Sequence, residues 1–503
     1  MARGSRSCTL LTLLLAILAA LACGPPAAAQ MRTQTQTQTL TPADSAAILL
    51  NRLAYGPRPG DIQRVASMGA MRWLDAQLKP GKDPARERVE QGFEILKLDR
   101  EELAQRFVAA RQARMKQRAD STQRGKDPAM RELRDLGLEF QQLAVARAVV
   151  SENQLQEILA DFWINHFNIF LGKNVERYLM PSYVEDVIRP RVLGRFEDLL
   201  IATAESPAMM VYLDNTLSVA EGGVAPQLAR AEARNRGWDS VRAESTLARL
   251  KARMPVGINE NYARELFELH TLGVDGGYTQ KDVEEAARVF TGWGVEPPRR
   301  GGGFIYREWA HDRGEKTVLG NRFPAGRGQE EGIELLRLLA RNPSTMLHVT
   351  TLLCQRLVSD DPPAGAIDAG VRAWQKSDGS IREVVRAIVT SPEFFAPEYY
   401  RAKVKSPFEY AVSAIRAVGA TTDGRAVSRQ IAEMGEPLYL CQPPTGYADT
   451  AEAWVNAGAL LARVNFAVAL TEGRVVGTLP DPNVVGAQAN AALDLGGPEF
   501  QRQ

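Results

Sequence analysis

Three of the chain's four histidines stand in separate segments that also carry carboxylate and amide side chains. Imidazole nitrogens and carboxylate oxygens are common metal ligands, and the same groups transfer protons in acid–base catalysis. If the fold brings the three histidines together with Asp312, they would form either a metal site or an acid–base cluster. The predicted catalytic residues are His270, Glu265, His166 and His311.

Polar and aromatic side chains of the same three segments are the predicted binding residues. The set consists of Asn259, Asn261, Arg264, Asn165, Trp163, Asp312, Lys316 and Trp293. A divalent metal is an option for the cofactor, but no standard ligand motif such as His-Glu-x-x-His is present. The sequence also lacks a nucleophile elbow and a phosphate-binding loop.

The segment that ends at His270 predicts a helix with two distinct faces. At 100° per residue, Asn261, Arg264 and Glu265 share a polar face, whereas His270 falls on the apolar face with Asn259. A buried imidazole needs hydrogen-bonding partners. The alternative interpretation is therefore a solvated polar face and a hydrogen-bonded core histidine.

The segment DFWINHFNIFLG predicts a second helix of this kind. Asp161, Asn165 and Asn168 fall at i, i+4 and i+7 and form a polar stripe, while His166 lies on an aromatic face with Phe162. This pattern is typical of a core histidine, and a ligand role for His166 is the alternative.

The elements that must position these residues are predicted to be helical, with one exception. Helical periodicity runs from Pro42 to about 220 and resumes at Glu330, and Thr279 with Asp282 has the spacing of a capping box. Alternating apolar and polar residues predict a small β-hairpin near 303–320. The predicted fold is mainly α, a multi-helix bundle-like globular protein with this hairpin as an insertion.

The N-terminal 29 residues are predicted to be a signal peptide, because basic residues precede an apolar core and a small-residue run that ends at Ala29. Cleavage after Ala29 would release a periplasmic or extracellular protein. Lipid anchoring at Cys23, in an imperfect lipoprotein box, is the alternative. No later apolar run reaches the roughly 18 residues needed to span a bilayer.

The rest of the chain divides by composition into a tether, a large helical domain and a tail. The predicted parts are a disordered Thr/Gln tether at 30–41, a helical domain at 42–475 and a flexible tail at 476–503, with potential sub-domains 42–220 and 256–475 on either side of a charged insertion at 220–255.

The 61 basic and 60 acidic residues give a net charge of +1, so no global field favours nucleic acid or an anionic membrane. Cys354 and Cys441 could form one disulfide in an oxidising compartment.

Several long motifs resemble the exported bacterial family known as domain of unknown function 1800. They include LNRLAYGPRPGD, FWINHF, NENYARELFELHTLGVDGGYTQKDV with FTGW, HDRGEKTVLG and KSPFEY, and they extend over nearly all of the mature chain. The resemblance implies a mainly helical exported protein, often encoded beside a partner family of sulfatase-like proteins. It implies no established reaction.

One departure from the family pattern falls at the segment NPSTMLH. The family typically has histidine where this chain has Asn342, arginine at Leu347 and lysine at Leu352, and His348 is displaced from the family's histidine position. If those groups do chemistry in relatives, the chemistry of this chain is weakened or changed.

Two classes of function follow. The first is an exported enzyme, a metal-assisted hydrolase or an oxidoreductase, with a cleft between the helices at 161 and 259 and the hairpin at 311. The second is a non-catalytic binding or assembly protein of the cell envelope that works with the sulfatase-like partner.

Overall fold

The computed structural model describes residues 40–119, 128–173, 175–220, 257–487 and 490–503. Within these ranges the chain is mainly helical and contains three two-stranded antiparallel sheets, which confirms the predicted fold class. The predicted signal peptide, Cys23, nearly all of the Thr/Gln tether and nearly all of the charged insertion lie outside the described residues.

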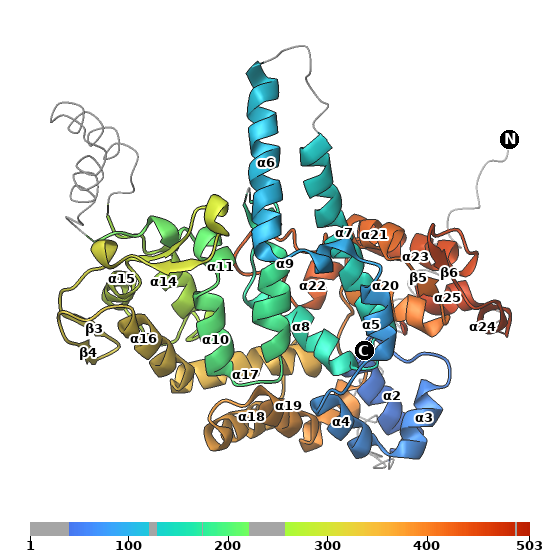
Figure 1. Ribbon diagram of the computed structural model, residues 1–503. Coiled ribbons are helices and arrows are strands. Elements are labelled where there is room, and N and C mark those ends of the chain that lie inside the picture. The colour runs from blue at the N-terminus through green and yellow to red at the C-terminus, as the bar shows by residue number, and fades with distance from the viewer. Residues whose placement is uncertain (1–39, 120–127, 174, 221–256, 488–489) are drawn as a thin grey trace, which may run out of the picture. The chain divides into compact units, whose positions relative to one another are not determined.

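The helices of the first part run up to the charged insertion (Figure 1). Their bounds are α2 Pro42–Arg52, α3 Asp61–Met68, α4 Ala70–Leu78, α5 Pro84–Glu90, α6 Arg100–Ala119, α7 Pro128–Val150, α8 Gln154–His166, α9 Glu176–Ser182, α10 Phe196–Ala204 and α11 Pro207–Tyr212. The long, charged helix α6 lies side by side with α7 (Figure 1).

The helices after the insertion complete the described fold. Their bounds are α14 Asn261–Glu265, α15 Gln280–Val289, α16 Glu330–Ala340, α17 Pro343–Leu357, α18 Ala364–Ser377, α19 Ile381–Val389, α20 Pro407–Ala417, α21 Arg425–Glu433, α22 Ala451–Trp454, α23 Ala457–Thr471, α24 Pro482–Ala487 and α25 Ala491–Gly496. None of the helices in the described ranges is long and apolar enough to cross a membrane.

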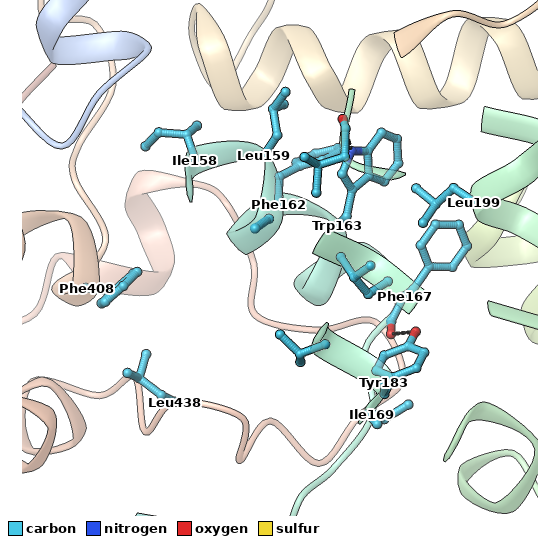
Figure 2. Close-up of a cluster of buried hydrophobic side chains, with 14 of the residues drawn as sticks. Ile158, Leu159, Phe162, Trp163, Phe167, Ile169, Tyr183, Leu199, Phe408 and Leu438 are labelled. Carbon is cyan, nitrogen blue, oxygen red and sulfur yellow. Dashed lines mark hydrogen bonds between the residues drawn. The ribbon is translucent and has the colours of Figure 1, made fainter. Parts of the chain in front are cut away.

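Helix α8 is buried along most of its length because apolar side chains surround it, as expected of a core helix. Figure 2 shows Trp163 and Phe167 packed with Leu199 of α10. The Trp163 indole donates from Nε1 to the carbonyl oxygen of Val192 at 3.2 Å, and Tyr183 donates to the carbonyl oxygen of Phe167 at 2.7 Å. These bonds satisfy the polar atoms of the aromatic core and fix the end of α8.

The segment after α14 follows the local predictions. A π-helical turn, Leu266–His270, continues α14, and Gly273 adopts a left-handed conformation with φ 83° where the chain leaves the helix. Thr279 and Asp282 form the predicted capping box at the start of α15. The polar face is partly exposed and His270 is buried, as the helical periodicity predicted.

The hairpin region contains two hairpins. Strand β1 (Trp293–Val295) pairs with β2 (Phe304–Tyr306), and β3 (Lys316–Val318) pairs with β4 (Asn321–Phe323). The segment from His311 to Gly314 therefore connects two hairpins and does not form the polar tip of one, which explains how His311 can be buried.

The C-terminal segment 476–503, for which the sequence predicted a flexible tail, has regular structure in its described residues. Strand β6 (Thr478–Leu479) pairs with β5 (Thr421–Thr422), and α25 packs on α23. The backbone of Lys403 bonds with that of Gln503 in both directions. Residues Pro42–Gln503 form one compact unit.

Candidate functional site

The structure brings together three histidines, but not the three that were predicted. His166 Nε2 lies 3.2 Å from the carbonyl oxygen of His270, and their rings are 6.2 Å apart. The third member is His348 on α17, whose Nε2 lies 3.4 Å from the carbonyl oxygen of Leu269. His311, the other histidine singled out in the sequence, contacts Thr291 and Glu331 in a different cluster.

The imidazoles of this histidine cluster are held neutral. Burial lowers the pKa of His166 well below its usual value, and the neighbouring His270 and His348 lower it further. Burial alone lowers the pKa of His270 to about 3. The Nε2 atom of His270 has no hydrogen-bond partner among the described residues.

His311 belongs to a buried ion-pair cluster beside the hairpins. Its Nδ1 lies 2.8 Å from the carbonyl oxygen of Thr291, and its Nε2 is 3.6 Å from Glu331. Lys316 donates to the same Glu331 carboxylate at 2.8 Å. Asp312 binds the Arg288 guanidinium through both oxygens, at 2.8 and 3.1 Å. Lys316 thus pairs with Glu331 and Arg288 with Asp312, and the neighbouring Trp293 is buried in the core.

The predicted binding residues around α14 make hydrogen bonds and ion pairs with neighbouring parts of the chain. Asn259 and Asn261 donate from Nδ2 to the carbonyl oxygens of Asp214 and Leu213, both at 3.2 Å. Arg264 pairs with Glu260 at 3.1 Å and with Gln280 at 2.9 Å. Burial and the nearby Glu268 raise the pKa of Glu265.

A cavity of about 310 Å³ lies beside α8 and brings together distant parts of the chain. Asp161, Asn165 and Asn168, the stripe noted in the sequence, line it together with His166 and His348, whereas His270 lies behind the wall. Further lining residues come from α17, from the segment at 436–450 and from Trp454 of α22.

Asn165 fastens the loop before α22 to α8. Its side chain donates to the carbonyl oxygen of Tyr447 at 2.8 Å and accepts from the Tyr447 backbone nitrogen at 2.7 Å. Asn168 donates to the carbonyl oxygens of Cys441 and Pro443. Asn165 in the last turn of α8 and Asn168 just after the helix thus set the position of one cavity wall.

One wall of the cavity is charged, and Arg356 lies at its centre. It is 5% exposed, pairs with the buried Glu409, and donates to Asp161 at 3.1 Å. Lys403 and Glu409 do not line the cavity and support this wall from behind: Lys403 Nζ lies 3.0 Å from the lining residue Asp449 and also pairs with Asp360.

The carboxyl groups at this wall differ in pKa. Burial raises the pKa of Asp161 to about 6, partly offset by Arg356. Burial, reinforced by the Asp161 charge, raises the pKa of Glu436 to about 8. Arg356 and Lys403 overcome burial at Glu409 and lower its pKa. Near neutral pH the wall therefore holds a protonated acid, a group that can exchange its proton, and a fixed carboxylate.

The sequence missed Arg356, Glu409, Glu436 and Asp449 as site residues. Glu409 does carry a local signal, because it closes a capping box with Ser406 at the start of α20. That signal places Glu409 at a helix start without indicating that its carboxylate meets Arg356.

At the departure from the family pattern, Asn342 caps α17 by accepting from the Ser344 nitrogen at 2.9 Å.

Within the described ranges, no group of three or more histidine, cysteine, aspartate or glutamate residues is arranged to hold a metal ion. The two cysteines that could have formed a disulfide, Cys354 and Cys441, are buried and free. Burial raises the pKa of Cys354 to about 12 and that of Cys441 to about 11. Neither thiol is thus prepared to act as a nucleophile.

Comparison with known proteins confirms the resemblance noted in the sequence. The family model of DUF1800, described as a protein of unknown function, matches residues 48–499. No curated protein and no solved structure matches the chain. Because the match covers nearly the whole chain, the protein belongs to the DUF1800 family.

Proposed function

We propose that the protein is an exported enzyme that performs acid–base chemistry on a small molecule bound in the cavity beside α8. The observation that carries this proposal is the meeting of Asp161, Glu436 and Asp449 at one cavity wall, although they come from distant parts of the chain. Carboxyl groups rarely gather in a partly closed cavity for stability alone, because burying a charge is unfavourable.

Asp161 and Glu436 have complementary roles in this proposal. Asp161 is the general base, because its side chain remains 32% exposed toward the cavity and its pKa of about 6 leaves it ionised yet basic near neutrality. Glu436 is the general acid, because its raised pKa keeps the proton on the carboxyl group at neutral pH. Arg356 is a positioning residue that orients Asp161 while Glu409 supports it from behind.

The test compares the reactions of the protein with those of variants at these two residues. The purified full chain is incubated with a small-molecule extract of the cell envelope, and the products are followed by liquid chromatography and mass spectrometry. The wild-type protein should consume at least one compound. Asp161→Asn and Glu436→Gln should each slow that consumption by about 100-fold or more, the usual contribution of a general acid or base.

Asp275→Asn is the matched control, because Asp275 is exposed on the turn after α14 and does not line the cavity. This variant should retain the wild-type rate, and circular dichroism should show the same helical content for all three variants. Equal consumption by wild type, Asp161→Asn and Glu436→Gln would refute the proposal.

A second candidate function is assembly with a sulfatase-like partner at the cell envelope. The observation that favours it is a group of exposed apolar side chains on the C-terminal helices: Leu461 is 62% exposed and Val464 42% exposed on α23, and Leu493 is 73% exposed on α25. Such groups of exposed apolar side chains are typical of interaction surfaces.

Co-purification of the full chain with the sulfatase-like protein tests this candidate. Leu461→Ser should abolish co-purification, whereas Leu347→Ser, which alters a 54% exposed leucine on α17, should not. Failure of the wild-type proteins to co-purify would count against assembly and leave the cavity proposal unaffected.

A further inference from the structure

The arginines on the α8 side of the cavity are already committed to protein carboxylates. Arg189 binds both oxygens of Glu157, at 2.9 and 2.7 Å. Arg147 binds both oxygens of Glu185, at 2.6 and 2.9 Å. These bidentate pairs use the guanidinium groups in their most favourable geometry, so neither arginine offers its charge to a ligand.

At the charged wall, by contrast, carboxyl groups outnumber the cations. Arg356 is shared by Asp161 and Glu409, and Lys403 is shared by Asp360 and Asp449. Each cation therefore meets two carboxylates.

Glu436 adds a fifth carboxyl group to this network, in which Asp161, Asp449 and Glu436 line the cavity while Glu409 and Asp360 lie behind the lining. It accepts a hydrogen bond from the Phe408 backbone nitrogen at 2.8 Å and forms no ion pair with the described residues. The next cation along the chain, Lys405, donates to Ser413 and lies over the Phe500 ring at 4.1 Å, so its charge is directed elsewhere.

Aromatic rings line the same cavity. Tyr447 and Trp454 both belong to the lining, and their ring centroids are 6.0 Å apart. Phe162 and Phe408 also contribute to the lining. The faces of aromatic rings attract cations, and aromatic rings combined with carboxylates are a common setting for ammonium groups.

We propose that the substrate of this cavity is an organic cation, a protonated amine held between the carboxyl groups of Asp161 and Glu436 and the rings of Tyr447 and Trp454. This inference rests on the acid–base function proposed for the same cavity. The ammonium group supplies the missing counter-charge of the wall, and its N–H groups donate to the carboxyl oxygens of Asp161 and Glu436. An anionic substrate would meet the surplus carboxylates and, among the described lining residues, no uncommitted cation.

Three probes of similar shape and different charge test the inference. Cyclohexylamine, cyclohexanol and cyclohexanecarboxylate are titrated into the full chain by isothermal calorimetry at about pH 7.5, where the amine is protonated. The ammonium probe should bind at least about tenfold more tightly than the alcohol, the size of one charge-assisted hydrogen bond. The carboxylate probe should bind most weakly.

Two variants locate the binding. Asp161→Asn should remove about tenfold of the ammonium preference, because it replaces a carboxylate by a neutral amide of the same shape. Glu436→Gln should remove less of it, because the Glu436 carboxyl group is mostly protonated at this pH and the amide oxygen still accepts a hydrogen bond. Asp275→Asn should leave the preference unchanged. Using both cavity variants guards against the loss of one of them to misfolding.

Several outcomes would overturn the inference: equal or tighter binding of the carboxylate probe, no binding of the ammonium probe, or an ammonium preference that both cavity variants retain. These outcomes differ from failure of the proposed function. If the carboxylate probe binds tightly and Asp161→Asn changes that binding, an amine substrate is refuted. The acid–base function of the cavity then still stands, and the product analysis tests it separately.

Discussion

His270 is 2% exposed, and its Nε2 atom lies in the protein interior without a hydrogen-bond partner among the described residues. An unpaired buried polar atom costs free energy that an apolar side chain of the same size would not. His270 also does not line the cavity, whereas His166 and His348 do. At the scale of the residue, packing therefore explains His270 better than proton transfer does.

This interpretation predicts different results for two substitutions of His270. His270→Ala should lower the free energy of unfolding by about 2–4 kcal/mol because it leaves a void in the core. His270→Leu fills most of that space and should cost less than about 1.5 kcal/mol. Urea denaturation near pH 8 measures both values. A stable His270→Ala protein that has lost all activity would instead support a catalytic role.

The stabilities of the wild-type protein and of His270→Leu should depend differently on pH. The folded-state pKa of about 3 lies below the usual value of 6.5, so below pH 6.5 the unfolded imidazole binds a proton that the folded protein excludes. The wild-type protein thus loses stability as the pH falls from 6.5. His270→Leu lacks this loss and should become relatively more stable by about 2 kcal/mol between pH 8 and pH 5.

At the scale of the element, the cavity depends on how the loop before α22 meets α8. Gly446 adopts φ 69°, and a Cβ atom at this position would lie 2.5 Å from both the backbone oxygen and the Oδ1 atom of Asn165. Only a residue without a side chain permits this approach. The loop carries Tyr447 next to Gly446, so the contact also places an aromatic ring of the wall.

Gly446→Ala and Gly473→Ala separate the effect of backbone strain from the effect of this contact. Gly473 has φ 65°, and a Cβ atom added there would have no neighbour within 4 Å, so its substitution should cost only about 1–2 kcal/mol for the left-handed conformation. Gly446→Ala should cost more than that and should also weaken binding of the ammonium probe. Urea denaturation and calorimetry measure the two effects. Equal losses of stability with unchanged binding in both variants would mean that the loop does not depend on this contact.

At the scale of the whole molecule, local structure was predictable from the sequence, whereas contacts between distant parts of the chain were not. The faces of the helix that ends at His270 and the capping box of Thr279 with Asp282 follow from residues a few positions apart, and the structure has both. The ion pair of Arg356 with Asp161 joins positions 195 residues apart, and no periodicity encodes it. The contact of His311 with Glu331 is of the same kind, since the motif around His311 gives no information on which later element it contacts.

The protonation of the charged wall is a property of the whole fold, and it should be visible in global stability. Between pH 4.5 and about 8 the folded protein keeps the proton on Glu436 while the unfolded chain loses it. The folded state therefore binds more protons, and this group lowers stability as the pH rises, by up to about 1.4 kcal/mol per pH unit. Glu436→Gln removes this contribution but keeps the shape of the side chain.

We expect the stability of the Glu436→Gln protein relative to wild type to increase progressively as the pH rises from 5 to 8. Urea denaturation at each pH, with Asp275→Asn as the control, measures the difference. Other titrating groups, including Asp161 and the buried histidines, are present in both proteins and largely cancel in the comparison. A constant difference between the two proteins across this range would show that Glu436 titrates normally, and it would remove Glu436 as the general acid.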